Sequence, residues 1–67
     1  MNPEIEDLDG MLTMMERHGG SFVRYLACAW RCADPENSAR LAATFPEYVE
    51  NYSVMAKGAR ERGELVS

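Results

Sequence analysis

The sequence predicts a small all-α protein, a bundle of three or four helices with short turns marked by Gly and Pro. The main evidence is three short segments, at residues 18–21, 33–36 and 44–47, where residues that end a helix meet residues that begin one. No stretch alternates apolar and polar residues as a strand would. We expect one domain over residues 1–67, with helices at 3–18, 22–33, 35–44 and 46–62 and a loose tail at 63–67.

The length of the chain makes its stability marginal. With 67 residues, of which 46% are hydrophobic, it can form one packed core. A core of this size buries only about 60% of the surface that the unfolded chain exposes. Domains this small often gain stability from disulfides, metals or oligomerisation. The composition therefore predicts a folded domain for which self-association is one source of stability.

The first expected helix has an apolar face and two alternative starting points. Pro3 suits a first helical turn, and Asn2 can cap it. Glycine costs roughly 1 kcal/mol in a helix interior. The helix can therefore start nearer to Gly10 instead, with Asp7 or Asp9 as its cap. The residues at helical spacing on the apolar face are Ile5, Leu8, Met11, Leu12 and Met15.

The second expected helix is apolar around most of its circumference. Gly19 or Gly20 is expected to end the preceding helix in the left-handed conformation, and Ser21 to cap the new one. Arg24 and Arg31 mark a solvated side, with Tyr25, Cys28 and Cys32 beside the main apolar stripe. Such a helix indicates a central position or a second partner surface. The predicted stripe consists of Phe22, Leu26, Ala29, Trp30 and Ala33.

The last two expected helices begin at proline-containing turns. Asp34 is expected to cap the third helix, with Pro35 in its first turn, and Thr44 with Glu47 has the spacing of a capping box for the fourth. Gly63 is expected to end the fourth helix, whose polar side carries Val54. The apolar residues are Ala39, Leu41, Ala42 and Phe45 in the third helix and Tyr48, Val49, Tyr52, Met55, Ala56 and Ala59 in the fourth.

The charge of the chain disfavours nucleic acid as a partner, and the lack of a long apolar run disfavours a membrane. A net charge of −4 opposes nonspecific binding to nucleic acid, which needs clustered Lys and Arg. No apolar run approaches the roughly 18 residues of a membrane span, and the acidic first residues lack the features of a signal peptide. We therefore expect a cytoplasmic protein whose cysteines are reduced, with no membrane partner.

The reactive side chains do not form a recognisable catalytic or metal site. Cys28 and Cys32 are one helical turn apart, but structural zinc takes four ligands and His18 would supply at most a third. We expect both thiols to pack as small apolar groups, with a redox role or a metal shared between two chains as alternatives. No set of nucleophile, base and oxyanion donors can be assembled. We predict no catalytic residue, no cofactor and no metal.

The surplus of bulky apolar side chains is the main indication of function. A domain with so little interior must leave some of its aromatic and Met residues partly exposed, which is typical of interaction surfaces. The sequence predicts a non-enzymatic, homodimeric protein-interaction module. The alternative is a helix-turn-helix DNA-binding regulator that uses the second and third helices, with Arg40 on the latter. The predicted interaction residues are Arg24, Tyr25, Cys28, Arg31, Cys32, Tyr48 and Tyr52.

Residues 18–48 resemble a type of short phage and prophage protein. The similarity lies in His18-Gly-Gly-Ser-Phe-Val-Arg-Tyr-Leu through Trp30-Arg, in Ala33-Asp-Pro-Glu-Asn, and in Arg40-Leu to Phe45-Pro-Glu-Tyr48. The resemblance implies an origin in a phage or another mobile element. It also implies that the protein acts in the bacterial host by binding a host protein, and it assigns no catalytic residue.

Overall fold

A computed structural model describes residues 5–65, which form four helices and no strand in that range. The helices are α1 (Leu8–His18), α2 (Ser21–Arg31), α3 (Pro35–Thr44) and α4 (Pro46–Glu61). They make a compact all-α structure of 31 × 27 × 20 Å, which confirms the predicted fold class. No helix within residues 5–65 has the length and apolar character needed to cross a bilayer.

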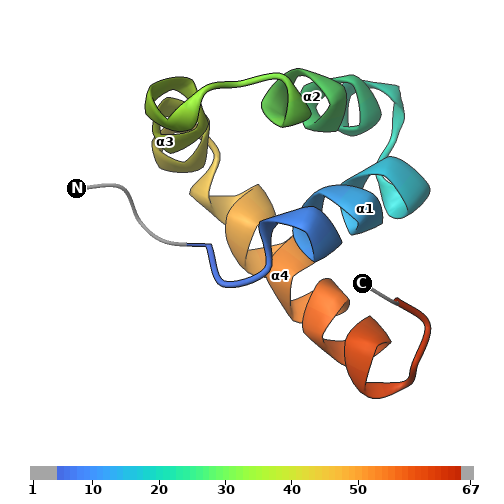
Figure 1. Cartoon of the computed structure of the whole chain (residues 1–67). Coiled ribbons are helices and arrows are strands. Elements are labelled where there is room, and N and C mark those ends of the chain that lie inside the picture. The colour runs from blue at the N-terminus through green and yellow to red at the C-terminus, as the bar shows by residue number, and fades with distance from the viewer. Residues whose placement is uncertain (1–4, 66–67) are drawn as a thin grey trace.

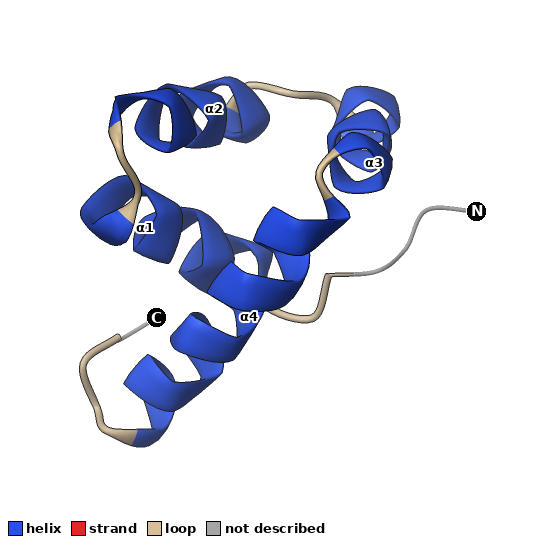
Figure 2. Ribbon diagram, turned by 180° about the vertical axis from the view of Figure 1, so that it is seen from behind, coloured by secondary structure: helices blue, strands red, loops and turns tan. Residues whose placement is uncertain are grey.

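α1 lies at the centre of the bundle, packed against α2 on one side and α4 on the other (Figure 1). α3 contacts α2 and α4 and closes the chain into a ring of helices, which is also seen from behind (Figure 2). The sequence assigned either a central position or a partner surface to the second helix. The structure gives the central position to the first helix, because its Met side chains are buried in two directions.

α1 begins later than residue 3, because Asp7 caps it. Residues 5–7 are not helical, and the proposed cap Asn2 and Pro3 lie outside the described residues. The Asp7 carboxylate accepts a hydrogen bond of 3.1 Å from the Gly10 amide. It also accepts two from the Arg60 guanidinium on α4, one of them at 3.0 Å from Nη2. Asp7 is one of the two alternative caps that the sequence predicted. Its hydrogen bonds to Arg60 hold it against α4 at the start of α1.

The charge of Asp7 is expected to contribute its full stabilisation above about pH 4 and progressively less as the pH falls further. The hydrogen bond from Arg60 is the main cause that lowers the pKa of Asp7, and the Gly10 amide adds to it. A carboxylate with a lowered pKa in the folded state contributes stability above its unfolded pKa of about 3.9 and loses it as the pH falls through the folded value.

Asp7→Asn tests this prediction, because Asn caps a helix as well as Asp but carries no charge. We expect Asp7→Asn to be less stable than the wild type in urea unfolding at pH 7, and the difference to shrink toward zero as the pH falls below about 4. Asp7→Ala should lose about 1 kcal/mol more than Asp7→Asn, since it also removes the cap. A difference between wild type and Asp7→Asn that is constant from pH 2 to pH 7 would contradict the role of the charge.

The α1–α2 corner uses its two glycines differently from the prediction. Gly19 ends α1 with φ −81° and Gly20 precedes α2 with φ −72°, so neither is left-handed. A Cβ on Gly19 would lie 2.6 Å from both the Met15 carbonyl oxygen and the Val23 Cβ. Gly19 is therefore required by close packing. Ser21 already lies in the first turn of α2, and no side chain caps that helix, so its predicted capping role is wrong.

The turns on either side of α3 are built in two ways. Asp34 caps α3 as predicted, accepting a 2.8 Å hydrogen bond from the Asn37 amide, and Pro35 is in the first turn. The capping box predicted for α4 is absent. Phe45 serves as the single junction residue between α3 and α4, so Thr44 is still inside α3 and donates its hydroxyl to the Arg40 carbonyl oxygen at 2.7 Å.

Gly63 ends α4 as predicted, in the left-handed conformation with φ 76°. The amide of Gly63 donates to the Arg60 carbonyl oxygen and that of Glu64 to the Ala59 carbonyl oxygen, at 3.1 and 2.8 Å. This is the pair of bonds of a Schellman motif, which reverses the chain. Leu65 is thereby buried against α1 and α4, so the prediction of a loose tail is wrong up to residue 65; residues 66–67 are outside the described part.

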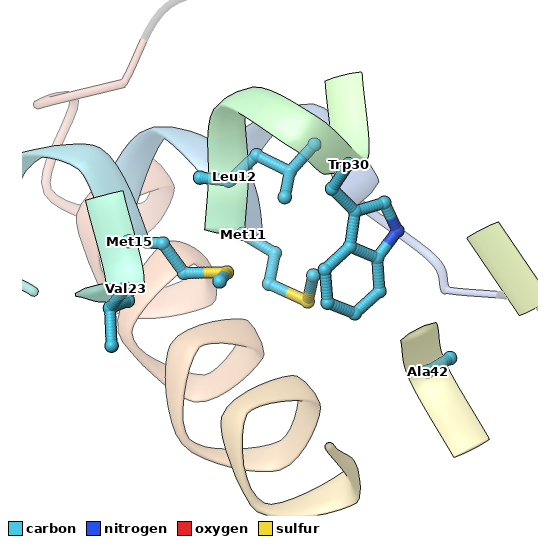
Figure 3. Packing of buried hydrophobic residues seen from close by; sticks show 7 residues of the cluster. Met11, Leu12, Met15, Val23, Trp30 and Ala42 are labelled. Atoms are coloured by element: carbon cyan, nitrogen blue, oxygen red, sulfur yellow. The ribbon is translucent and has the colours of Figure 1, made fainter. Parts of the chain in front are cut away.

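The core has two parts that meet at α1. The larger one surrounds Trp30, whose indole lies beside Met11 and turns its nitrogen toward α3 (Figure 3). That nitrogen donates a 2.9 Å hydrogen bond to the Ser38 hydroxyl. The smaller part joins Met14 to Ala56, Ala59 and Leu65.

The buried stripe of α2 is rotated from the predicted one. It consists of Val23, Ala27 and Trp30, whereas Phe22 and Ala29 are exposed. α2 also ends at Arg31 rather than at residue 33, and α4 at Glu61 rather than at residue 62. The predicted face of α4 is confirmed: Ala56 and Ala59 are buried, and Val54 is 67% exposed on the opposite side.

Candidate interaction surface

The side of α2 that faces away from α1 carries large exposed apolar side chains. Phe22 is 60% and Tyr25 65% exposed. Cys28, Ala29 and Cys32 are exposed on the same side, one or two turns further along. We refer to these five residues as the α2 outer face. It exists because α2 buries only a narrow stripe of three residues and is apolar over most of the remainder.

An aromatic cluster continues the α2 outer face onto α4. The rings of Phe45 and Tyr48 stack with centroids 5.5 Å apart and 12° between their planes. Phe22 contacts both rings, at 6.2 and 6.5 Å, and Tyr52 follows Tyr48 at 6.2 Å. Phe45, Tyr48 and Tyr52 are half-buried. Phe22 belongs to both groups, so the apolar surface runs without interruption from α2 to the start of α4.

Arg24 borders the α2 outer face and packs on it. Its guanidinium carbon lies 5.3 Å from the centroid of the Tyr25 ring. Such a cation–π contact is worth about 0.5–1 kcal/mol at an exposed site. The contact places a positive charge beside an aromatic ring at the edge of the surface, and Arg and Tyr are both enriched in protein–protein interfaces.

Arg31 differs from the other predicted interaction residues because it is engaged within the chain. Its guanidinium forms ion pairs with Glu16 and Asp9, both at 2.9 Å, and donates to the Thr13 hydroxyl at 3.1 Å. Hydrogen bonds to Glu16 and then Asp9 raise the pKa of Arg31 further above its already high value. Arg31 therefore joins α2 to α1.

Cys28 and Cys32 are both free and exposed, which corrects the prediction that they pack as small apolar groups. Because the buried stripe of α2 passes through Val23, Ala27 and Trp30, the cysteines fall on the opposite side of the helix. Free cysteine is among the residue types most often buried in proteins. Two exposed thiols on one face of one helix are therefore unusual.

The structure brings most of the predicted interaction residues to one surface, but not Arg31. Arg24, Tyr25, Cys28 and Cys32 lie together on α2, and Tyr48 and Tyr52 belong to the adjoining aromatic cluster. Sequence reasoning missed Phe22 and Phe45, which it had placed in the core. No local pattern separates Phe22 from its neighbour Val23, because Val23 is buried through the packing of the α1–α2 corner beside Gly19.

Two hollows flank α3. One, of about 490 Å³, lies between α1, α2 and α3 and is lined by Trp30, Leu8, Leu12 and Ala39, with Ile5 at its edge. The other, of about 430 Å³, lies between α2 and α3 and is lined by Cys32, Ala29 and Arg40 among others. Both are mainly apolar.

Among known proteins, neither the family models, the curated proteins nor the solved structures include a match to this chain.

Proposed function

We propose that this chain is a non-enzymatic protein-interaction module that forms a homodimer through the α2 outer face. The observation that carries the proposal is the exposure of Phe22 and Tyr25 on a continuous apolar surface. Monomeric proteins rarely expose contiguous apolar surface of this kind without using it. Burial of these two rings would also add to the small core of a short chain.

The proposed interface extends over parts of two helices. A standard interface covers about 800 Å² on each partner, compared with a total accessible surface of 4633 Å² for this chain. The α2 outer face extends over most of an 11-residue helix, and the aromatic cluster widens it toward α4. A symmetric pairing about a twofold axis places the same patch against itself, which suits a surface that is apolar and carries no carboxylate.

A host protein is the second partner in this proposal. The resemblance of residues 18–48 to short phage and prophage proteins supports an origin in a mobile element and a role in the bacterial cytoplasm. Aromatic residues, Met and Arg are the types enriched where proteins meet. Tyr25 with Arg24, and the half-buried Tyr48 and Tyr52, are the side chains that we expect to contact such a partner.

The alternative function, a DNA-binding regulator that uses α2 and α3, has less support. Arg40 on α3 lies 4.0 Å from Glu36 and hydrogen-bonds Asn37 at 3.5 Å. Arg31 is paired with carboxylates of α1. A DNA-reading helix needs a basic surround, because affinity depends on phosphate contacts. Salt-dependent binding to duplex DNA that Arg40→Ala weakens would favour this alternative over the dimer.

Tyr25→Glu is expected to dissociate the dimer. The substitution places a charge at the centre of the α2 outer face, where pairing would remove it from water without a partner. We expect the wild-type chain to sediment with twice its chain mass of 7.5 kDa. The variant should sediment as a single chain, with a dissociation constant raised at least about 30-fold, which corresponds to roughly 2 kcal/mol for the loss of an interface anchor.

Val54→Glu is the matched control. Val54 is as exposed as Tyr25, at 67% against 65%, but lies on the polar side of α4. It should leave the mass in solution unchanged. A wild-type chain that is monomeric at all accessible concentrations would overturn the dimer, as would equal effects of the two substitutions. Co-purification from host lysate, compared between wild type and Tyr25→Glu, then tests whether the same surface binds a host protein.

A further inference from the structure

We propose that Cys28 and Cys32 form a two-thiolate chelate for a soft, thiophilic cation of the Cu(I) type. Both thiols are exposed and free, Cys28 on α2 and Cys32 at the residue that caps the C-terminus of α2. The helical register continues through Cys32, whose amide donates to the Cys28 carbonyl oxygen at 3.3 Å, so the two residues are successive neighbours on one side of the helix. The two cysteines belong to the α2 outer face, next to the aromatic side chains that carry the proposed dimer, so the test below includes a variant that removes the dimer.

The spacing suits one ion held between the two sulfurs. Residues four apart on a helix have Cβ atoms about 5–6 Å apart. Metal–thiolate bonds are about 2.3 Å long in zinc sites. Rotation about the two Cα–Cβ bonds can bring both exposed sulfurs to such a distance from a single ion, since neither side chain is packed against the core.

The surroundings select the class of cation. Within residues 5–65 no group of three or more His, Cys, Asp and Glu side chains comes together to hold a metal. Structural zinc takes four ligands, and calcium and magnesium take oxygen ligands, so a pair of thiolates satisfies neither. Thiolates select soft ions, and Cu(I) accepts two ligands in a linear arrangement. The ligand count therefore favours a soft, two-coordinate ion.

The charge near the pair also suits this complex. Two thiolates and one monovalent cation carry a net charge of −1. Arg24 lies one helical turn before Cys28 on the same side of α2 and provides a positive charge. Binding breaks two S–H bonds, forms two S–Cu bonds and releases two protons to the buffer. Sulfur and copper keep their oxidation states, so no oxidant or reductant is needed.

The test is a titration of the reduced protein with Cu(I) held by a chromogenic chelator of known affinity, with the chelator absorbance as the readout. We expect the chain to withdraw one Cu(I) per chain. Cys28→Ser and Cys32→Ser should each weaken binding at least about 100-fold, because the second thiolate of a chelate binds at high effective concentration. Far-UV circular dichroism should show all variants folded, since both side chains are exposed.

The matched control keeps two thiols but changes their spacing. Cys32→Ser combined with Ala29→Cys leaves two exposed thiols on α2, about 100° apart around the helix instead of one above the other. We expect it to bind no better than a single-thiol variant. If it binds as tightly as the wild type, or if the wild type binds no tighter than the single variants, the chelate is overturned.

The proposed dimer uses the same helix, so the titration is repeated on Tyr25→Glu. One Cu(I) per chain in both proteins would support the chelate whether or not the dimer exists. A stoichiometry of one ion per two chains, lost in Tyr25→Glu, would overturn the single-chain site. Failure of the dimer is detected separately, by sedimentation of the metal-free protein.

Discussion

Replacing Trp30 by alanine is expected to remove a large part of the stability of the protein. Trp30 is the largest fully buried side chain, 1% exposed, and joins α2 to Met11 of α1 and, through its hydrogen bond to Ser38, to α3. Truncation of a buried Trp or Phe to Ala costs about 3–5 kcal/mol. A 67-residue domain has a total stability of roughly 3–10 kcal/mol at typical values per residue. Urea unfolding followed by far-UV circular dichroism measures the loss.

Two conservative variants separate the ring from its hydrogen bond. Trp30→Phe keeps an aromatic ring in the core but removes the donor to Ser38 and part of the ring volume, so it should lose less than Trp30→Ala. Ser38→Ala leaves the indole N–H without its partner and should cost about 1–3 kcal/mol. If Trp30→Ala loses no more stability than Trp30→Phe, the indole is not the centre of the core.

The second large effect is expected at Gly19. Gly19→Ala should cost about 1–3 kcal/mol, because the new Cβ would collide with the Met15 carbonyl oxygen and with Val23, and overpacking a tight contact costs this much. The φ of −81° is open to alanine, so the cost comes from space and not from backbone conformation. Urea unfolding midpoints of the variant and the wild type give the difference.

Gly20→Ala is the control for Gly19→Ala, one residue away in the same turn. A Cβ there would meet nothing within 4 Å, and the φ of −72° is also ordinary. Alanine is a poorer N-cap than glycine, but it reduces the entropy of the unfolded chain, so the two effects nearly cancel. Equal destabilisation by both substitutions would show that the turn needs flexible backbone rather than close approach at Gly19.

The parts of the fold that depend on neighbouring residues could be predicted from the sequence. Asp34 and Pro35 start α3, and Gly63 ends α4, because caps act on amides and carbonyls within a few residues. The same reasoning failed at Ser21 and Thr44. Each could cap a helix, but Gly20 and Phe45 occupy the junctions, and where the chain turns depends on packing between helices.

The candidate surface could be predicted only in part. A helix that is apolar around most of its circumference gives a helical wheel little contrast, so the wheel could not show that Val23 and Ala27 are buried while Phe22 is exposed. The contacts of α2 with α1 determine which of its side chains are buried. Likewise, the pairing of Arg31 with Asp9 and Glu16 joins residues 22 and 15 positions apart, a separation about which local pattern carries no information.

The position of α1 between α2 and α4 has a consequence for synthesis on the ribosome. α1 is synthesised before α4, yet its Met14 side is covered by Ala56 and Ala59 of α4 and by Leu65. Until these residues have left the ribosome, this apolar face of α1 has no partner in the nascent chain. A pause in synthesis before α4 therefore leaves a species prone to aggregation.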